Sequence, residues 1–162
     1  MLRMKYVCLL VLLLSACRRD ADSVANLAGT ILTPDVAERI FGALAEAAKV
    51  NSQADTKSGE AVVSRCSFSW KNAAGTATIV SLLIRRAPTL EEGKAIFLAS
   101  KLTQHDEETA NLGDAAYRTA APAQLNVLKG RNWLVISAGT SPTPDPGLQE
   151  KAAREILKNI QD

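Results

Sequence analysis

Apolar side chains recur at intervals of three or four residues in three stretches, and each stretch predicts an amphipathic helix. The predicted helices cover residues 34–48, 89–102 and 146–160. Thr33, Thr89 and Asp145 are expected to cap their first turns, and Gly42 is a point where the first helix would end early. The side chains expected to be buried are Val36, Ala37, Ile40, Phe41, Leu44, Ala47 and Ala48 in the first helix, Ala95, Leu98, Ala99 and Leu102 in the second, and Leu148, Ala152, Ala153, Ile156, Leu157 and Ile160 in the third.

Alternating apolar and polar positions between these helices predict strands separated by turn residues. The predicted strands cover residues 61–71, 76–86, 115–118, 124–129 and 132–138, and residues 51–59 are expected to form a polar loop. Residues 76–86 are apolar on both faces, which favours a central strand. Because strands joined by tight turns pair antiparallel, we expect a single α+β domain with one antiparallel sheet packed by helices on one face.

The amino terminus has a different pattern, in which two cations precede a short apolar run. Arg3 and Lys5 come first, residues 6–14 are apolar, and Leu14-Ser15-Ala16-Cys17 follows. This order is typical of a secretory signal peptide. The apolar run is shorter than the roughly 20 residues that a membrane-spanning helix needs, so it is not expected to remain as a transmembrane segment.

Leu14-Ser15-Ala16-Cys17 resembles the lipobox of bacterial lipoproteins. The resemblance implies a thioether-linked diacylglycerol on Cys17, cleavage before this cysteine and acylation of the new amino terminus. The alternative is an ordinary signal peptide cut near Ala16. The expected organisation is a lipoprotein signal peptide over residues 1–16, the lipidated cysteine with a flexible tether over residues 17–29, and one globular domain over residues 30–162.

The resemblance also implies a location at the periplasmic face of a cell membrane, held there by the lipid on Cys17. Among such lipoproteins, aspartate after the cysteine is the signal for retention in the inner membrane, and Arg18 at this position favours the outer membrane if the organism has one. The chain has 19 Lys and Arg against 17 Asp and Glu, and loss of Arg3 and Lys5 leaves 17 of each. A balanced charge gives no support to a nucleic-acid partner.

Cys66 is the single cysteine that remains in the expected domain, because Cys8 leaves with the signal peptide and Cys17 carries lipid. Strand alternation places Cys66 on the same face as Phe68 and Trp70. We therefore expect a small buried hydrophobe, with a reactive or pairing thiol as the alternative.

Several residue groups are candidates for chemistry, although each has a plainer structural interpretation. Cys66 and His105, with Asp106 to orient the imidazole, would form a nucleophile and base, but neither lies in a glycine-rich elbow. The acidic run His105-Asp106-Glu107-Glu108 has neither calcium-loop nor paired-histidine spacing. We therefore predict no catalytic residue, no metal site and no cofactor.

Aromatic and basic side chains on the strands have similar alternatives. Trp70, Trp133 and Tyr117 are candidates for stacking on a glycan or peptide, but aromatics make up only 4% of the chain, so core packing is favoured. Arg85-Arg86 is a candidate carboxylate or phosphate clamp, with a solvated strand end as the favoured interpretation.

Short motifs spread along the domain resemble exported bacterial lipoproteins of unknown function. They are Leu32-Thr33-Pro34, Cys66 with Trp70, Leu112-Gly113-Asp114-Ala115, and Lys129-Gly130 through Trp133. The leading hypothesis is a non-catalytic, lipid-anchored domain that binds or scaffolds another envelope component. The alternatives are a small envelope hydrolase that uses Cys66 and His105, and a periplasmic protector lipoprotein of the immunity type.

Overall fold

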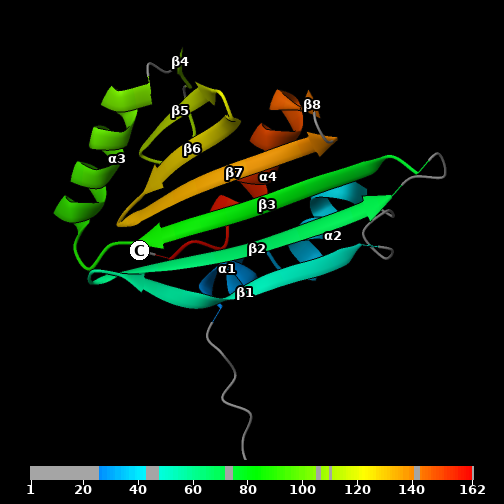
Figure 1. Cartoon of the computed structure of the whole chain (residues 1–162), viewed down its shortest axis with the longest axis horizontal. Helices are drawn as coiled ribbons and strands as arrows, with labels where there is room; N and C mark the ends of the chain where they lie inside the picture. The colour runs from blue at the N-terminus through cyan, green and yellow to red at the C-terminus, as the bar shows by residue number, and fades with distance from the viewer. Residues whose placement is uncertain are drawn as a thin grey trace, which may run out of the picture.

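The structure is a computed structural model that describes residues 26–42, 48–71, 75–104, 107–109, 111–140 and 143–161. Within these residues an eight-stranded antiparallel sheet packs with four helices (Figure 1). The elements are α1 (Leu27–Ile31), α2 (Pro34–Phe41), β1 (Lys49–Ser58), β2 (Ala61–Lys71), β3 (Ala77–Arg86), α3 (Leu90–Gln104), β4 (Glu107–Glu108), β5 (Ala115–Ala120), β6 (Ala123–Lys129), β7 (Asn132–Thr140), β8 (Thr143–Pro144) and α4 (Pro146–Leu157). The predicted α+β class and single domain are confirmed.

The strand order is β1-β2-β3-β7-β6-β5-β4, with β8 added to β7. β3 lies between β2 and β7, which confirms the central position that its apolar character predicts. The hairpins β2–β3 and β6–β7 are also confirmed, with bounds close to those expected.

The main core lies between one face of the sheet and helices α1, α2 and α4, which Figure 1 shows behind the sheet. Alternate side chains of β3 point to this face, and Val80, Leu82 and Ile84 have no exposed surface. Asp145 caps α4 by accepting from the Leu148 amide at 2.9 Å, as expected.

Helix α3 is the exception to the expectation that helices pack on one face. Phe97 of α3 packs with Tyr117 and Leu128, whose strand neighbours Ala116 and Val127 belong to the main core. Because successive strand residues point to opposite faces, α3 covers the other face of the sheet, over the end formed by β5, β6 and β7 (Figure 1).

The buried side of α3 also differs from the predicted one. Gly93 and Phe97 are buried, whereas Leu98 is 53% exposed and Leu102 is 80% exposed. Two contacts set the rotation of the helix. A Cβ on Gly93 would lie 3.0 Å from the Arg131 Cα, so a side chain there would crowd the Arg131 backbone, and the Tyr117 hydroxyl donates to Ser100 Oγ at 2.8 Å.

The polar loop predicted over residues 51–59 is wrong, because all of these residues except Gly59 belong to the edge strand β1. Almost every side chain of β1 is exposed, so its sequence lacks the alternation of apolar and polar residues that indicates a strand with one buried face. Backbone pairing with β2 holds the strand, with a register shift between Gln53 and Thr56.

The first helix ends where Gly42 adopts a φ of 69°, and part of its predicted extension, residues 43–47, lies outside the described residues. The folded domain begins earlier than the predicted boundary at residue 30. Asn26 caps α1, and Ala28 is fully buried, so residues 26–29 are not tether. The signal segment and Cys17 lie outside the described residues. No helix in the described part of the chain combines the length and apolar composition needed to cross a bilayer.

Candidate ligand-binding site

The face of the sheet that carries α3 is covered by this helix at one end and has two hollows beside it. Two adjoining hollows share Ser81, Gln124 and Ser137, and we call them together the open-face trough. All three residues point away from the main core, because Leu82, Leu125 and Ile136 beside them are core residues. Both hollows are open depressions of the sheet face and not enclosed cavities.

The polar half of the trough has a volume of about 520 Å³ and lies next to the end of α3. It is lined by Arg65, Ser81, Leu83, Gln104, Gln124, Asn126, Trp133, Val135 and Ser137. These side chains supply amides, hydroxyls, one guanidinium and one indole. No aspartate or glutamate lines this hollow among the described residues.

Strand register fixes how this half is arranged. Arg65 pairs with Leu83, Leu83 with Val135, and Val135 with Asn126, so the four side chains form one row across β2, β3, β7 and β6. Three inter-strand spacings of about 4.8 Å put the Arg65 and Asn126 Cα atoms about 14 Å apart. The row therefore has a cation at one end, an amide at the other, and an apolar floor between them.

Trp133 and Asn126 form the best-defined contact of the trough. The indole Nε1 donates to Asn126 Oδ1 at 3.0 Å, which fixes the orientation of the amide. Asn126 is only 2% exposed, and its Nδ2 has no hydrogen-bond partner in the part of the chain that the structure describes. A buried donor without a protein acceptor is uncommon and costs stability.

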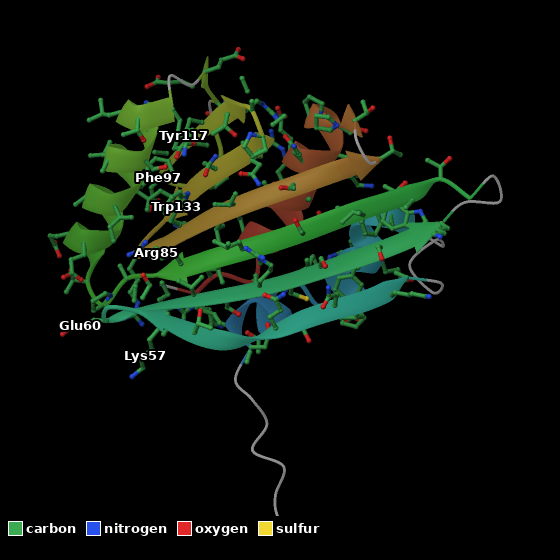
Figure 2. The ribbon with its side chains drawn as sticks, viewed as in Figure 1. Lys57, Glu60, Arg85, Phe97, Tyr117 and Trp133 are labelled. Carbon is green, nitrogen blue, oxygen red and sulfur yellow. The ribbon has the colours of Figure 1, made fainter. Side chains whose placement is uncertain are left out.

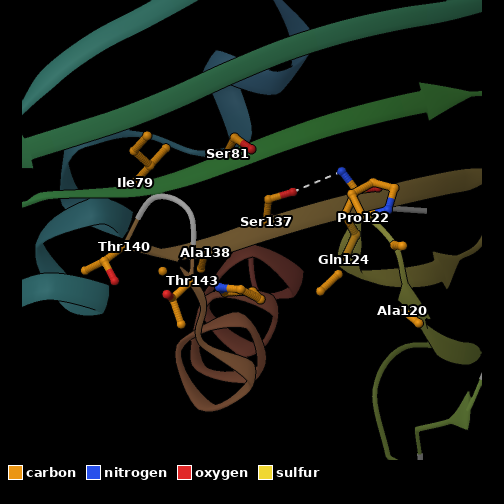
Figure 3. Close-up of a pocket in the computed structure, with 13 residues that line it drawn as sticks. Ile79, Ser81, Ala120, Pro122, Gln124, Ser137, Ala138, Thr140 and Thr143 are labelled. Atoms are coloured by element: carbon orange, nitrogen blue, oxygen red, sulfur yellow. Dashed lines mark hydrogen bonds between the residues drawn. The ribbon is translucent and has the colours of Figure 1, made fainter.

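The other half of the trough is more apolar, with a volume of about 620 Å³ (Figure 3). Its walls are the turn between β5 and β6 and the short strand β8, which contribute Pro122 and Pro144, and Ile79 lies on its floor. Gln124 donates to Ser137 Oγ at 3.1 Å where the two halves meet, as the dashed line in Figure 3 shows.

The residues singled out from sequence do not gather in this trough. Cys66 is 1% exposed and lies on the face of the sheet that α1, α2 and α4 cover. Its Sγ is 3.8 Å from the Leu32 carbonyl oxygen, and this position confirms the buried interpretation. Burial raises the pKa of its thiol. His105 and Asp106, the proposed base and its orienting group, lie outside the described residues.

The acidic run is described only in part. Glu107 and Glu108 form the exposed strand β4, and Glu108 is paired with Lys101 of α3. This hydrogen bond and the charge of Lys101 lower the pKa of the Glu108 carboxyl. Among the described residues no group of three histidine, cysteine, aspartate or glutamate side chains is placed to hold a metal ion.

Of the three candidate aromatic residues, two are core residues and one lines the trough. Trp70 is 7% exposed and Tyr117 is fully buried, which confirms core packing for both. Trp133 is partly buried at the edge of the small cluster under α3, where Figure 2 shows it near Phe97 and Tyr117. Trp133 also lines the polar half of the trough.

The favoured interpretation of Arg85-Arg86 as a solvated strand end is wrong, since both side chains are partly buried. Arg86 Nε donates to Asn132 Oδ1 at 2.8 Å, and burial together with Arg131 lowers the pKa of Arg86. Arg85 pairs with Trp133, and its buried Nε has no partner in the described part of the chain.

Sequence reasoning missed Arg65, Gln124 and Asn126 as site residues. The signal was present in part, because alternation places Arg65 on the face away from Cys66. It takes the strand order β2-β3-β7-β6 to bring these three residues onto one surface. Comparisons of the chain with protein-family models, with curated proteins and with solved structures found no match.

Proposed function

We propose that this chain is a lipid-anchored envelope protein whose domain binds another envelope component in the open-face trough without catalysing a reaction. The observation that carries the proposal is the unpartnered Asn126 amide beside a hollow rich in hydrogen-bond donors. A purely structural sheet face gains nothing from a buried donor without an acceptor. A binding face does, because the ligand supplies the acceptor.

The position of the candidate nucleophile supports binding rather than hydrolysis. The Cys66 thiol is buried on the face that α1, α2 and α4 cover, whereas the trough lies on the opposite face, so the sheet separates the thiol from a substrate in the trough. Its raised pKa also keeps it in the thiol form, which is the weaker nucleophile.

The anchor is the second part of the proposal, and the lipobox-like Leu14-Ser15-Ala16-Cys17 supports it. Two or more acyl chains hold a protein on a bilayer stably, whereas one chain does so only reversibly. An acylated Cys17 therefore keeps the domain at the membrane surface.

The test compares envelope components retained by three forms of the full-length chain in detergent extracts. Ser137→Tyr fills the junction of the two halves of the trough. Thr56→Tyr adds the same bulk on exposed β1, outside the residues that line the trough. Retention by the native chain and by Thr56→Tyr, with loss in Ser137→Tyr, supports the proposal. Equal retention by all three forms, or none by any, contradicts it.

The anchor is tested separately by mass spectrometry of the mature amino terminus and by cell fractionation. We expect an acylated Cys17 in the membrane fraction. A Cys17→Ala chain should remain unprocessed or appear in the soluble fraction. An unmodified mature cysteine would contradict the anchor and leave the trough proposal standing.

A further inference from the structure

We infer that the ligand of the open-face trough is a sugar that carries a carboxylate, an inference that rests on the proposed binding function. It follows from three features of the polar half: the sign of its charge, the surplus of donors over acceptors, and the apolar surface between them.

The charge of the polar half points to an anion. Arg65 is the one charged residue in its lining, and no carboxylate lies among the described residues that face it. Arg65 has no ion pair or side-chain hydrogen bond in the described part of the chain, so its guanidinium is available to a ligand. Guanidinium binds carboxylate through two parallel hydrogen bonds, a geometry that an uncharged hydroxyl cannot match.

The remaining polar groups point to hydroxyl groups on the same ligand. Gln104, Gln124 and Asn126 supply amides, which both donate and accept, and Ser81 and Ser137 supply hydroxyls. The Asn126 Nδ2 is the donor that lacks an acceptor, because Trp133 holds the Oδ1. A ligand with several hydroxyl oxygens pairs with such a surface, whereas a simple aliphatic acid leaves most of it unpaired.

Size and shape complete the assignment. The floor between Arg65 and Asn126 consists of Leu83 and Val135, and the Trp133 indole stands beside it. One face of a sugar ring is made of C–H groups, which pack on apolar and aromatic side chains while the ring hydroxyls reach the edges. The row of about three inter-strand spacings, about 14 Å between its outer Cα atoms, has the length for one or two such rings.

The experiment uses the two tryptophans of the chain. Trp70 is buried in the core against Phe41, so Trp70→Phe leaves Trp133 as the single indole reporter. The full-length Trp70→Phe chain is titrated with sodium D-glucuronate, D-glucose, sodium acetate and trialanine, and the fluorescence of Trp133 is followed. Calorimetric titration of the same samples detects binding that does not change the fluorescence.

We expect saturable binding of glucuronate, with an affinity at least about tenfold higher than that of glucose, acetate or trialanine. Arg65→Gln should lower the glucuronate affinity at least about tenfold. Lys57→Gln removes the same charge from the exposed edge strand, outside the residues that line the trough, and should change the affinity less than about twofold.

Three results would overturn the inference: no saturable binding of glucuronate, equal affinity for glucuronate and glucose, or tighter binding of trialanine. Equal losses in Arg65→Gln and Lys57→Gln would also count against it, since they would indicate a general effect of charge. If glucuronate fails while Ser137→Tyr still abolishes retention of an envelope component, the trough binds a ligand of another class and only this inference falls. If both tests fail, the binding function falls as well.

Discussion

The indole nitrogen of Trp133 donates to Asn126 Oδ1 at 3.0 Å, and this contact leaves the other half of the same amide without an acceptor. Asn126 lies on β6 and Trp133 on the neighbouring strand β7, where Trp133 packs against the cluster that contains Phe97 of α3. One hydrogen bond thus fixes an indole at the edge of the trough and orients a buried donor.

We predict that Asn126→Val abolishes glucuronate binding with little effect on stability. Trp133 Nε1 loses its acceptor, which costs about 1–3 kcal/mol, but removal of the unpartnered Nδ2 relieves a penalty of similar size. The free energy of unfolding should therefore stay within about 1 kcal/mol of the native value, as measured by urea denaturation.

Asn132→Val is the matched control for this substitution. Asn132 is 1% exposed on β7, but its Oδ1 accepts from Arg86 Nε at 2.8 Å and its Nδ2 donates to the Lys129 carbonyl at 3.1 Å. The same change should cost roughly 2–4 kcal/mol here, because two hydrogen bonds are lost and the partly buried Arg86 Nε loses its acceptor. Equal costs at the two positions would contradict the role given to Asn126.

Gly113 and Gly59 form a second matched pair, since both have a positive φ, of 60° and 64°. A Cβ on Gly113 would lie 2.3 Å from the Leu128 carbonyl oxygen, whereas a Cβ on Gly59 meets nothing within 4 Å. We expect Gly59→Ala to cost about 1–2 kcal/mol, from the backbone conformation alone. Gly113→Ala should cost roughly 2–5 kcal/mol, because it adds a clash with β6. The midpoints of urea unfolding compare the two, and a smaller loss for Gly113→Ala would be inconsistent with this contact.

Glu155 of α4 should make stability depend on pH on the acid side. Its carboxylate accepts from Lys158 Nζ at 2.5 Å and from Arg39 Nε of α2 at 2.8 Å, and these hydrogen bonds lower its pKa. A group with a lowered pKa in the folded state contributes stability above its unfolded pKa, and this contribution is lost as the pH falls through the folded value.

We therefore expect the native chain to lose stability more steeply than Glu155→Gln as the pH falls below about 4.5, the ordinary value for this group. Urea unfolding at several pH values measures the two slopes, and Glu38→Gln, on an exposed position of α2, is the control. Parallel slopes for the native chain and Glu155→Gln would show that the two hydrogen bonds do not persist in solution.

Cys66 should give the opposite dependence on the alkaline side. Burial raises the pKa of its thiol above the ordinary value of 9.0, so the unfolded chain ionises at a lower pH than the folded one. The stability that the neutral thiol contributes is fully present below the unfolded pKa and is lost as the pH rises toward the folded value. Cys66→Ala should remove this part of the alkaline slope.

Labelling gives an independent measurement of the same thiol. In a chain with Cys8 and Cys17 replaced by serine, Cys66 is the one cysteine left. It should react with an aromatic disulfide reagent only after denaturation, because it is 1% exposed. Rapid reaction in the folded state would revive the hydrolase alternative.

Most of the fold follows from periodicity, and the errors have identifiable physical causes. β2 and β3 were predictable because a buried face requires apolar residues at regular positions, and this periodicity is visible in the sequence. β1 has no such pattern, since its side chains are exposed and the backbone of β2 holds it. In α3 the sequence offers two faces for burial, one through Leu98 and Leu102 and one through Gly93 and Phe97. Contacts with strands distant in sequence determine that the second face is buried.

The candidate site was less accessible to sequence reasoning than the fold. Arg65 and Asn126 are about 60 positions apart and become ends of one row only through the order β2-β3-β7-β6. Nor does the sequence tell that Asn126 is buried while half of its amide is unpaired, because this depends on its contact with Trp133 of the neighbouring strand.

Asn26 has a mechanical consequence for a lipidated chain. Its Nδ2 donates to the Gln53 carbonyl of β1 at 2.5 Å and to the Arg65 carbonyl of β2 at 3.3 Å. The chain that leads from Cys17 therefore joins the domain at the edge strand β1 and its neighbour β2. Eight residues lie between Cys17 and Asn26, and the nine Cα–Cα steps that join the two give a tether of about 30 Å at full extension. Anything else embedded within that radius meets the domain at an effective concentration of millimolar order. Even a Kd in the millimolar range would then keep a membrane-bound glycan substantially occupied, so the titrations with free glucuronate have to reach millimolar concentrations.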